Sequence, residues 1–154
     1  MGILTEDMKR VVNQQRLGFV ATVCPDGTPN LSPKGTTTVF DDDHLVFADI
    51  CSPGTVANLR GNPAVEINVV DPIVRKGYRF KGRAAVLTDG SQCDELVAFF
   101  RARGVAATIR GVVLVRVERA EALISPAYDV AGTTEAQVRA RWRAHFDSLA
   151  EHHQ

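Results

Sequence analysis

The sequence predicts a mainly β protein, an antiparallel barrel of about six strands with helices at its edges. Short segments rich in β-branched and aromatic residues follow one another, and most are joined by turn signals rather than by long helices. No Gly-x-Gly-x-x-Gly motif follows a predicted strand, which disfavours a dinucleotide-binding α/β fold. The 154 residues contain no repeat, low-complexity tract or linker. We therefore expect one domain over residues 1–154.

The strands are predicted from period-two patterns and from β-branched composition. They cover residues 17–23, 30–40, 44–48, 64–70, 78–87 and 111–124. Strong turn sequences separate the first three strands, at residues 25–29 (PDGTP) and 41–43 (DDD). In the fifth strand, Arg79 falls on the opposite face from Tyr78 and Phe80.

The helices are predicted at the periphery of the barrel. Thr5 is the expected N-cap of a first helix over residues 5–15. Ser52 and Pro53 open a short helix at residues 56–60, with serine at the N-cap and proline at the first helical position. An amphipathic helix is expected over residues 91–103. A last helix, at roughly residues 134–151, carries apolar residues at helical spacing, namely Val138, Trp142, Phe146 and Leu149.

The charge balance argues against whole classes of partner. Eighteen basic residues match eighteen acidic ones, so the overall field favours neither nucleic acid nor an anionic membrane. Apolar runs such as residues 111–115 are too short to span a bilayer, and the N-terminus lacks the pattern of a signal peptide. We therefore expect a cytoplasmic protein. Cys24, Cys51 and Cys93 have neither zinc-ligand nor disulfide spacing, and His44 after three aspartates indicates a solvated turn, so no metal site is expected.

Two segments interrupt the regular scaffold. The first is NLSPKGTTTVF at residues 30–40, where Pro33 cannot donate to a sheet ladder and Gly35 weakens a strand interior. Lys34 lies between them as the one positive charge of the stretch. The second is SPGT at residues 52–55, where a helix begins with unpaired N–H groups and a partial positive charge.

Together these segments have the chemistry of a pocket for a phosphorylated molecule. Ser52, Thr55 and Asn58 offer hydroxyl and amide donors, while Lys34 and Arg60 offer countercharge. A purely structural interpretation stays open at this point, since both segments also fit an ordinary helix start and an edge-strand bulge. The residues show no Ser/His/Asp or Cys/His nucleophile arrangement and no carboxylate pair, so catalytic residues stay unassigned.

Residues 17–87 resemble the FMN-binding split-barrel family related to pyridoxamine 5′-phosphate oxidase. The resemblance is carried by DGTPNLSPKGT, LVFAD, SPGTVANLRGNPAVEI and YRFKGRA, in this order, and is suggestive at residues 125–129 (SPAYD). It implies a six-stranded antiparallel split β-barrel. It also implies a homodimer with two FMN sites at the subunit interface.

The resemblance also implies the residues that contact the cofactor. The second strand would line the flavin, and the end of the third strand would contact the cofactor mostly through main-chain atoms. The turn into the helix would hold the phosphate. The fifth strand would close the site, and its arginine would approach the cofactor. In one alternative this arginine comes from the partner subunit. These residues are Ser32, Lys34, Gly35, Thr36, Ala48, Asp49, Ser52, Thr55, Asn58, Arg60 and Arg79. Lys34 is alternatively placed at the edge of the flavin ring.

The sequence departs from the pyridoxamine phosphate oxidases of this family. They carry an arginine-rich second strand and a C-terminal segment rich in Trp, Arg and His, whereas this chain has Ser-Pro-Lys-Gly and a helix around Trp142. We therefore expect an FMN-dependent oxidoreductase acting on an unassigned small molecule. Three alternatives stay open: an F420-dependent reductase on the same fold, a flavin- or haem-binding module without turnover, and a pyridoxamine phosphate oxidase proper.

Overall fold

The computed structural model describes residues 1–152, and the fold is mainly β with peripheral helices, as predicted. The strands are β1 (Gly18–Val23), β2 (Pro29–Lys34), β3 (Thr38–Val39), β4 (His44–Asp49), β5 (Ala64–Asp71), β6 (Lys76–Leu87) and β7 (Gly111–Ile124). The helices are α1 (Glu6–Gln15), α2 (Pro53–Gly61), α3 (Ser91–Ala102) and α4 (Glu135–Glu151), with a 3-10 turn η1 (Pro126–Asp129).

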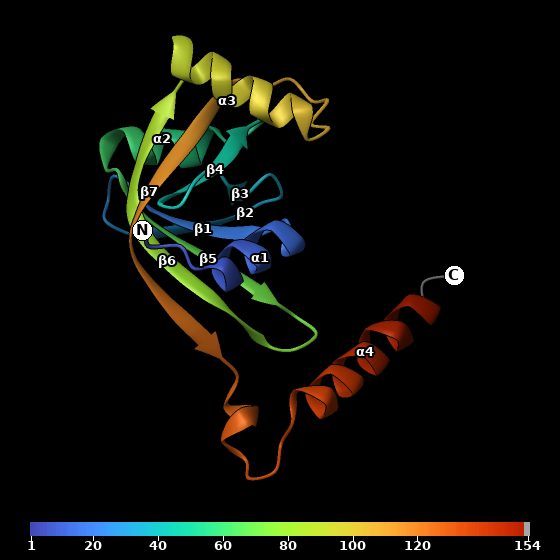
Figure 1. Ribbon diagram of the computed structural model, residues 1–154. Helices are drawn as coiled ribbons and strands as arrows, with labels where there is room; N and C mark the ends of the chain where they lie inside the picture. Colours follow the sequence, from blue (N-terminus) through green and yellow to red (C-terminus); the bar gives the residue numbers. More distant parts are fainter. Residues whose placement is uncertain (153–154) are drawn as a thin grey trace.

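All strands belong to one antiparallel sheet with the order β2-β1-β5-β6-β7-β4-β3. The sheet is strongly curved, so that β2 and β3 approach each other although they form its opposite edges (Figure 1). Only residues 35–37 connect these two edges. A connection of this length keeps Lys34 and Thr38 within about 14 Å of each other. The sheet is therefore a barrel that remains split between β2 and β3.

The described residues contain seven strands rather than the six expected, because the predicted strand over residues 30–40 is divided in two. The chain turns after Lys34, whose carbonyl oxygen accepts hydrogen bonds from the backbone N–H (3.3 Å) and the hydroxyl (2.8 Å) of Thr37. Gly18 makes room for this turn, since a Cβ there would lie 2.5 Å from Oγ1 of Thr37. The interruption that Pro33 and Gly35 indicate in the sequence is therefore a break between two strands.

The barrel interior is the main hydrophobic core. Val20, Phe47, Ile67 and Phe80 are completely buried within it, each contributed by a different strand. A second, smaller cluster lies where α3 covers the outer face of β4 and β7, and contains Val46, Ala48, Leu96, Phe100 and Val112. Because β4 contributes alternate residues to both clusters, it is buried on both faces, and the residues that follow it are held firmly in place.

The first helix begins as predicted. The hydroxyl of Thr5 accepts a hydrogen bond from the backbone N–H of Met8 (3.3 Å), which caps α1. The helix ends at Arg16, which adopts the left-handed conformation with φ 52°. No helix within residues 1–152 has the length and apolar character needed to cross a membrane.

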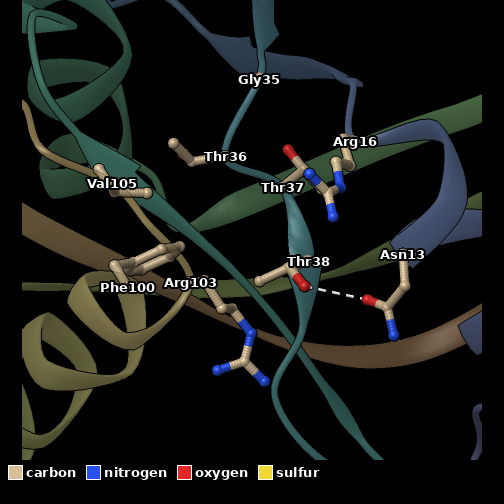
Figure 2. Close-up of a pocket in the computed structure, with 9 residues that line it drawn as sticks. All are labelled: Asn13, Arg16, Gly35, Thr36, Thr37, Thr38, Phe100, Arg103 and Val105. Carbon is tan, nitrogen blue, oxygen red and sulfur yellow. Dashed lines mark hydrogen bonds between the residues drawn. The ribbon is translucent and has the colours of Figure 1, made fainter.

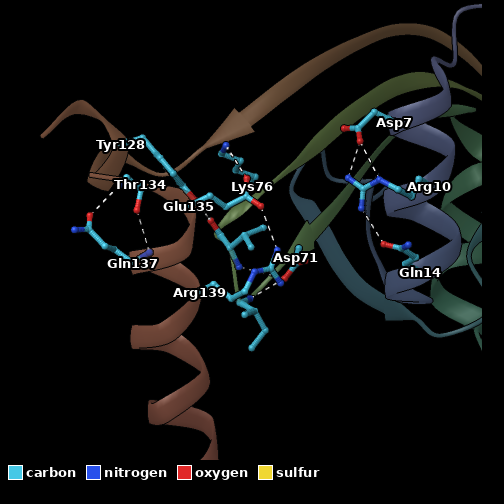
Figure 3. Close-up of polar contacts among 12 residues, drawn as sticks. Asp7, Arg10, Gln14, Asp71, Lys76, Tyr128, Thr134, Glu135, Gln137 and Arg139 are labelled. Carbon is cyan, nitrogen blue, oxygen red and sulfur yellow. Dashed lines mark hydrogen bonds and ion pairs between the residues drawn. The ribbon is translucent and has the colours of Figure 1, made fainter. Parts of the chain in front are cut away.

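The last helix extends away from the barrel (Figure 1). At its N-terminus, Lys76 on the β5–β6 hairpin forms an ion pair with Glu135 (3.2 Å), as Figure 3 shows. The guanidinium of Arg75 stacks on Trp142, 3.4 Å from the ring centroid. The apolar stripe predicted for this helix is only partly covered, since Val138 is buried whereas Phe146 remains exposed.

Candidate functional site

The structure brings the two irregular segments of the sequence together. The ammonium of Lys34, at the end of β2, donates hydrogen bonds to the hydroxyl of Ser32 (2.7 Å) and to the hydroxyl of Ser52 (2.8 Å). Ser52 immediately precedes α2, so its contact with Lys34 joins the edge strand to the start of this helix. Ser52 takes the predicted N-cap position, but its side chain makes no capping hydrogen bond because its oxygen faces Lys34.

Lys34 is a buried cation, with a fractional exposure of 8%. Burial lowers the pKa of its ammonium, and the nearby carboxylate of Asp49 acts in the opposite direction. Asp49 itself accepts a hydrogen bond from the backbone N–H of Ser52 (2.9 Å). No carboxylate in residues 1–152 lies within ion-pair distance of Lys34. An ammonium has three N–H donors, so one donor stays free beside the start of α2.

The turn between β2 and β3 is tied to the same place. The hydroxyl of Thr36 accepts a hydrogen bond from the backbone N–H of Ala48 near the end of β4 (2.9 Å). Six of the predicted cofactor residues thus form one connected region, which we call the Lys34 cluster: Ser32, Lys34, Thr36, Ala48, Asp49 and Ser52. Gly35 lies within the turn that this cluster holds.

Three predicted residues on α2, namely Thr55, Asn58 and Arg60, form no side-chain hydrogen bond with the Lys34 cluster. Thr55 and Asn58 are buried, and the amide nitrogen of Asn58 donates to the hydroxyl of Thr22 on β1 (3.0 Å). Asn58 therefore fixes α2 to the barrel. Arg60 lies in the last turn of the helix and is exposed. It is eight positions beyond Ser52, which corresponds to roughly 12 Å along a helix axis.

Arg79 lies on the outer face of the sheet, opposite the buried side chain of Phe80. Its guanidinium forms an ion pair with Glu66 on β5 (2.8 Å) and approaches Glu121 on β7 (3.8 Å). Within a single chain it is not part of the Lys34 cluster. Its contact with a cofactor, like the contacts of the residues on α2, stays a prediction.

A cavity beside the cluster was not predicted from the sequence. It has a volume of about 430 Å³ and lies between the end of α1, residues 35–38 and the end of α3 (Figure 2). Arg16 and Arg103 line it, together with Asn13, Phe100 and Val105. No local motif identifies these residues, because they come from helix ends that are far apart in the chain and that meet only in the folded barrel.

The fold is a split barrel, and the Lys34 cluster lies at the edge where the barrel is split. Residues 4–126 match the family model described as pyridoxamine 5′-phosphate oxidase, so the chain belongs to this family. The family match ends within η1, and α4 lies outside it. No curated protein matches the chain.

Solved structures agree with this assignment. HupZ from Group A Streptococcus is 34% identical, with a TM-score of 0.71 over 79% of this chain and 95% of that one. An FMN-binding protein from Syntrophomonas wolfei is 16% identical, with a TM-score of 0.64 over 76% of this chain and 84% of that one. An F420 reductase is 20% identical, with a TM-score of 0.60 over 77% of this chain and 98% of that one. The last two similarities concern the fold.

Proposed function

We propose that this protein binds FMN at the Lys34 cluster and acts as an oxidoreductase on a small molecule. The observation that supports this function is the buried ammonium of Lys34, which has a free donor and no carboxylate partner within residues 1–152. A buried cation in this state favours an anionic ligand, because the ligand would supply the direct ion-pair partner that no carboxylate within residues 1–152 provides. The N–H groups at the start of α2 add further donors for a phosphate.

The residues present fit this cofactor. Lys34 and Ser52 would bind an anionic group, and the backbone at Gly35 would allow a flat ring to approach closely. When bound, FMN supplies hydride transfer at its ring. The task of the chain is to orient the cofactor, and the positive charge of Lys34 would stabilise the negative charge of the reduced form.

The cofactor can be identified directly. Freshly purified protein should be yellow, and heat should release a molecule with the absorbance and mass of FMN. Colourless protein that fails to bind added FMN at micromolar concentrations would contradict the proposal. Reduction by NADH or NADPH, followed with a panel of electron acceptors, separates an enzyme from a flavin-binding module without turnover.

F420 is the second candidate cofactor, because the fold is shared with an F420 reductase. Its longer phosphodiester tail would need basic residues beyond Lys34, and Arg60 is the exposed cation on α2. Competitive titration with both cofactors distinguishes the candidates. An FMN protein should retain FMN in the presence of equimolar F420, and the opposite result would favour the reductase.

We further propose that the chain forms a homodimer through the outer face of β1 and β2. Phe19 and Leu31 are 41% and 66% exposed on this face, and they lie on neighbouring strands. Asn68 pairs with Phe19 on one side and with Arg79 on the other, so Arg79 lies on the same face. A partner packed here would bury the apolar residues and would bring Arg79 to the interface.

The dimer can be tested by light scattering after size-exclusion chromatography. The wild-type mass should be about twice 16.7 kDa, and Leu31→Glu should yield a monomer because it places a charge in the apolar patch. Val130→Glu is the control, since Val130 is similarly exposed (64%) but follows η1, beyond the sheet. A wild-type monomer that binds FMN tightly would refute a site shared between subunits.

A further inference from the structure

We propose that the cavity between α1 and α3 binds the substrate, and that this substrate is an organic anion with a carboxylate or phosphate group and a compact apolar body. The identification of the ligand as substrate depends on the proposed FMN function. The preference for an anion depends only on the residues of the cavity. At about 430 Å³, the cavity is within the usual range for small-molecule sites.

Two arginines supply positive charge at this cavity from opposite sides of residues 36–38 (Figure 2). Arg16 ends α1 and Arg103 follows α3. Within residues 1–152 neither guanidinium forms an ion pair, whereas Arg10 and Arg139 on other surfaces are paired with Asp7 and Glu135. No Asp or Glu lines the cavity. The positive charge at this place is therefore uncompensated.

The polar groups left free in the cavity are chiefly donors. The side-chain oxygen of Asn13 accepts from the hydroxyl of Thr38 (2.9 Å) and from the backbone N–H of Val39 (3.1 Å), which leaves the amide NH₂ free. The hydroxyl oxygen of Thr36 accepts from Ala48, so its own proton is available for donation. Guanidinium groups have only donors. A lining of this kind matches a carboxylate or phosphate better than a neutral or cationic ligand.

One arginine is held in place before any ligand binds. The guanidinium of Arg103 lies over the ring of Phe99, 3.3 Å from its centroid, and donates to the backbone oxygen of Phe99 (3.2 Å). Its remaining N–H groups are free for a ligand, because only one nitrogen takes part in this bond. Phe100 and Val105 form an apolar wall for the rest of the molecule.

The cavity adjoins the Lys34 cluster along the chain. Gly35 and Thr36 line the cavity and directly follow Lys34, and Thr36 is itself a member of the cluster. A ligand in the cavity would therefore lie against the same turn that would hold the flavin. This arrangement places a bound anion next to the cofactor, as a substrate of the proposed oxidoreductase would be.

Benzoate and benzamide are suitable probes, because they have the same ring and differ mainly in charge. Isothermal titration of the full chain should show saturable binding of benzoate and at least tenfold weaker binding of benzamide. Arg16→Gln and Arg103→Gln should each weaken benzoate binding about tenfold, and Arg103→Lys should retain part of the affinity because the charge remains. Arg143→Gln on α4 is the matched control and should bind benzoate like the wild type.

Loss of fold is monitored by circular dichroism and thermal melting of each variant. If wild type shows no saturable binding of benzoate, phenyl phosphate or inorganic phosphate up to roughly 50 mM, the inference is wrong. It is equally wrong if benzamide binds as well as benzoate, or if folded Arg16→Gln and Arg103→Gln variants both retain wild-type affinity.

A parallel FMN titration separates this inference from the proposed function. If FMN binds and the anions do not, only the inference about the cavity fails. If the anions bind and FMN does not, the cavity is an anion site and its role as a substrate site fails with the proposed function. When both bind, benzoate should shift the absorption spectrum of bound FMN. An unchanged spectrum would contradict the placement of the anion beside the flavin.

Discussion

Replacing Lys34 by methionine tests the proposed cofactor site most directly. Methionine has a similar length and is apolar, so it fills the buried space without charge. The ammonium uses two of its three N–H donors on Ser32 and Ser52, and one donor is left for a ligand. The substitution should therefore remove about one charge-assisted hydrogen bond to FMN, worth about 1.5–3 kcal/mol. The Kd for FMN should rise about 10- to 150-fold.

The stability of the cofactor-free protein should change in the other direction. Burial lowers the pKa of Lys34 below its usual value of 10.5, so the charged form opposes folding at neutral pH. Between the lowered pKa and 10.5 the unfolded chain binds more protons, and the stability of the wild type rises with pH relative to Lys34→Met. At pH 7 the variant should be at least as stable as the wild type, since water can bridge the two serine hydroxyls.

Two measurements check this reasoning. Quenching of flavin fluorescence gives the Kd for FMN, and urea unfolding at several pH values gives the stability of the cofactor-free protein. Lys9→Met is the control, because Lys9 on α1 forms ion pairs outside the site, with Glu6 on the same helix and with Asp42 between β3 and β4. A Lys34→Met variant that folds and binds FMN within twofold of wild type would refute the role given to Lys34.

Other substitutions test the scaffold around the site. Gly82→Ala should lower the free energy of unfolding by roughly 1–3 kcal/mol, because the new Cβ would lie 2.0 Å from a backbone oxygen of β7; unchanged urea unfolding would contradict this packing. Asn58→Ala should cost about 1–3 kcal/mol by leaving the buried hydroxyl on β1 without its donor, and a neutral result would show that α2 is fixed by other contacts. Tyr78→Phe should cost about 1 kcal/mol at pH 7, since the Tyr78 hydroxyl donates to Asp7 and lowers the pKa of that carboxyl. This last cost should fade as acid protonates the carboxyl below its ordinary value of 3.8, and a cost that persists at pH 2 would argue against the linkage.

Local chemistry explains what could be predicted from the sequence. Thr5 identified the start of α1, because a helix N-cap depends on residues that are neighbours in the chain. The two irregular segments around Lys34 and Ser52 could be recognised for the same reason, and their convergence was then confirmed. In the same way, alternating patterns located the strands to within a few residues.

Long-range pairing explains what could not be predicted. The break of one predicted strand into β2 and β3 depends on which strands they pair with, and these lie at opposite edges of the sheet. The meeting of Arg16 and Arg103 depends on the closure of the barrel. The sequence also could not show that Asn58 would bond to Thr22, because the same amide could equally have faced a ligand.

Residues 35–37 join β2 to β3, so a ligand bound at this connection would affect both edge strands of the barrel. The edge strand β2 ends at this short connection and the other edge strand, β3, begins after it. Any molecule bound against the connection would therefore restrain both edge strands at once. Amide hydrogen exchange in β2 and β3 should therefore slow when a ligand is added, while the interior strands β5 and β6 should exchange at an unchanged rate. In this arrangement, the segment that we propose to contact the ligand would also limit how far the barrel can open.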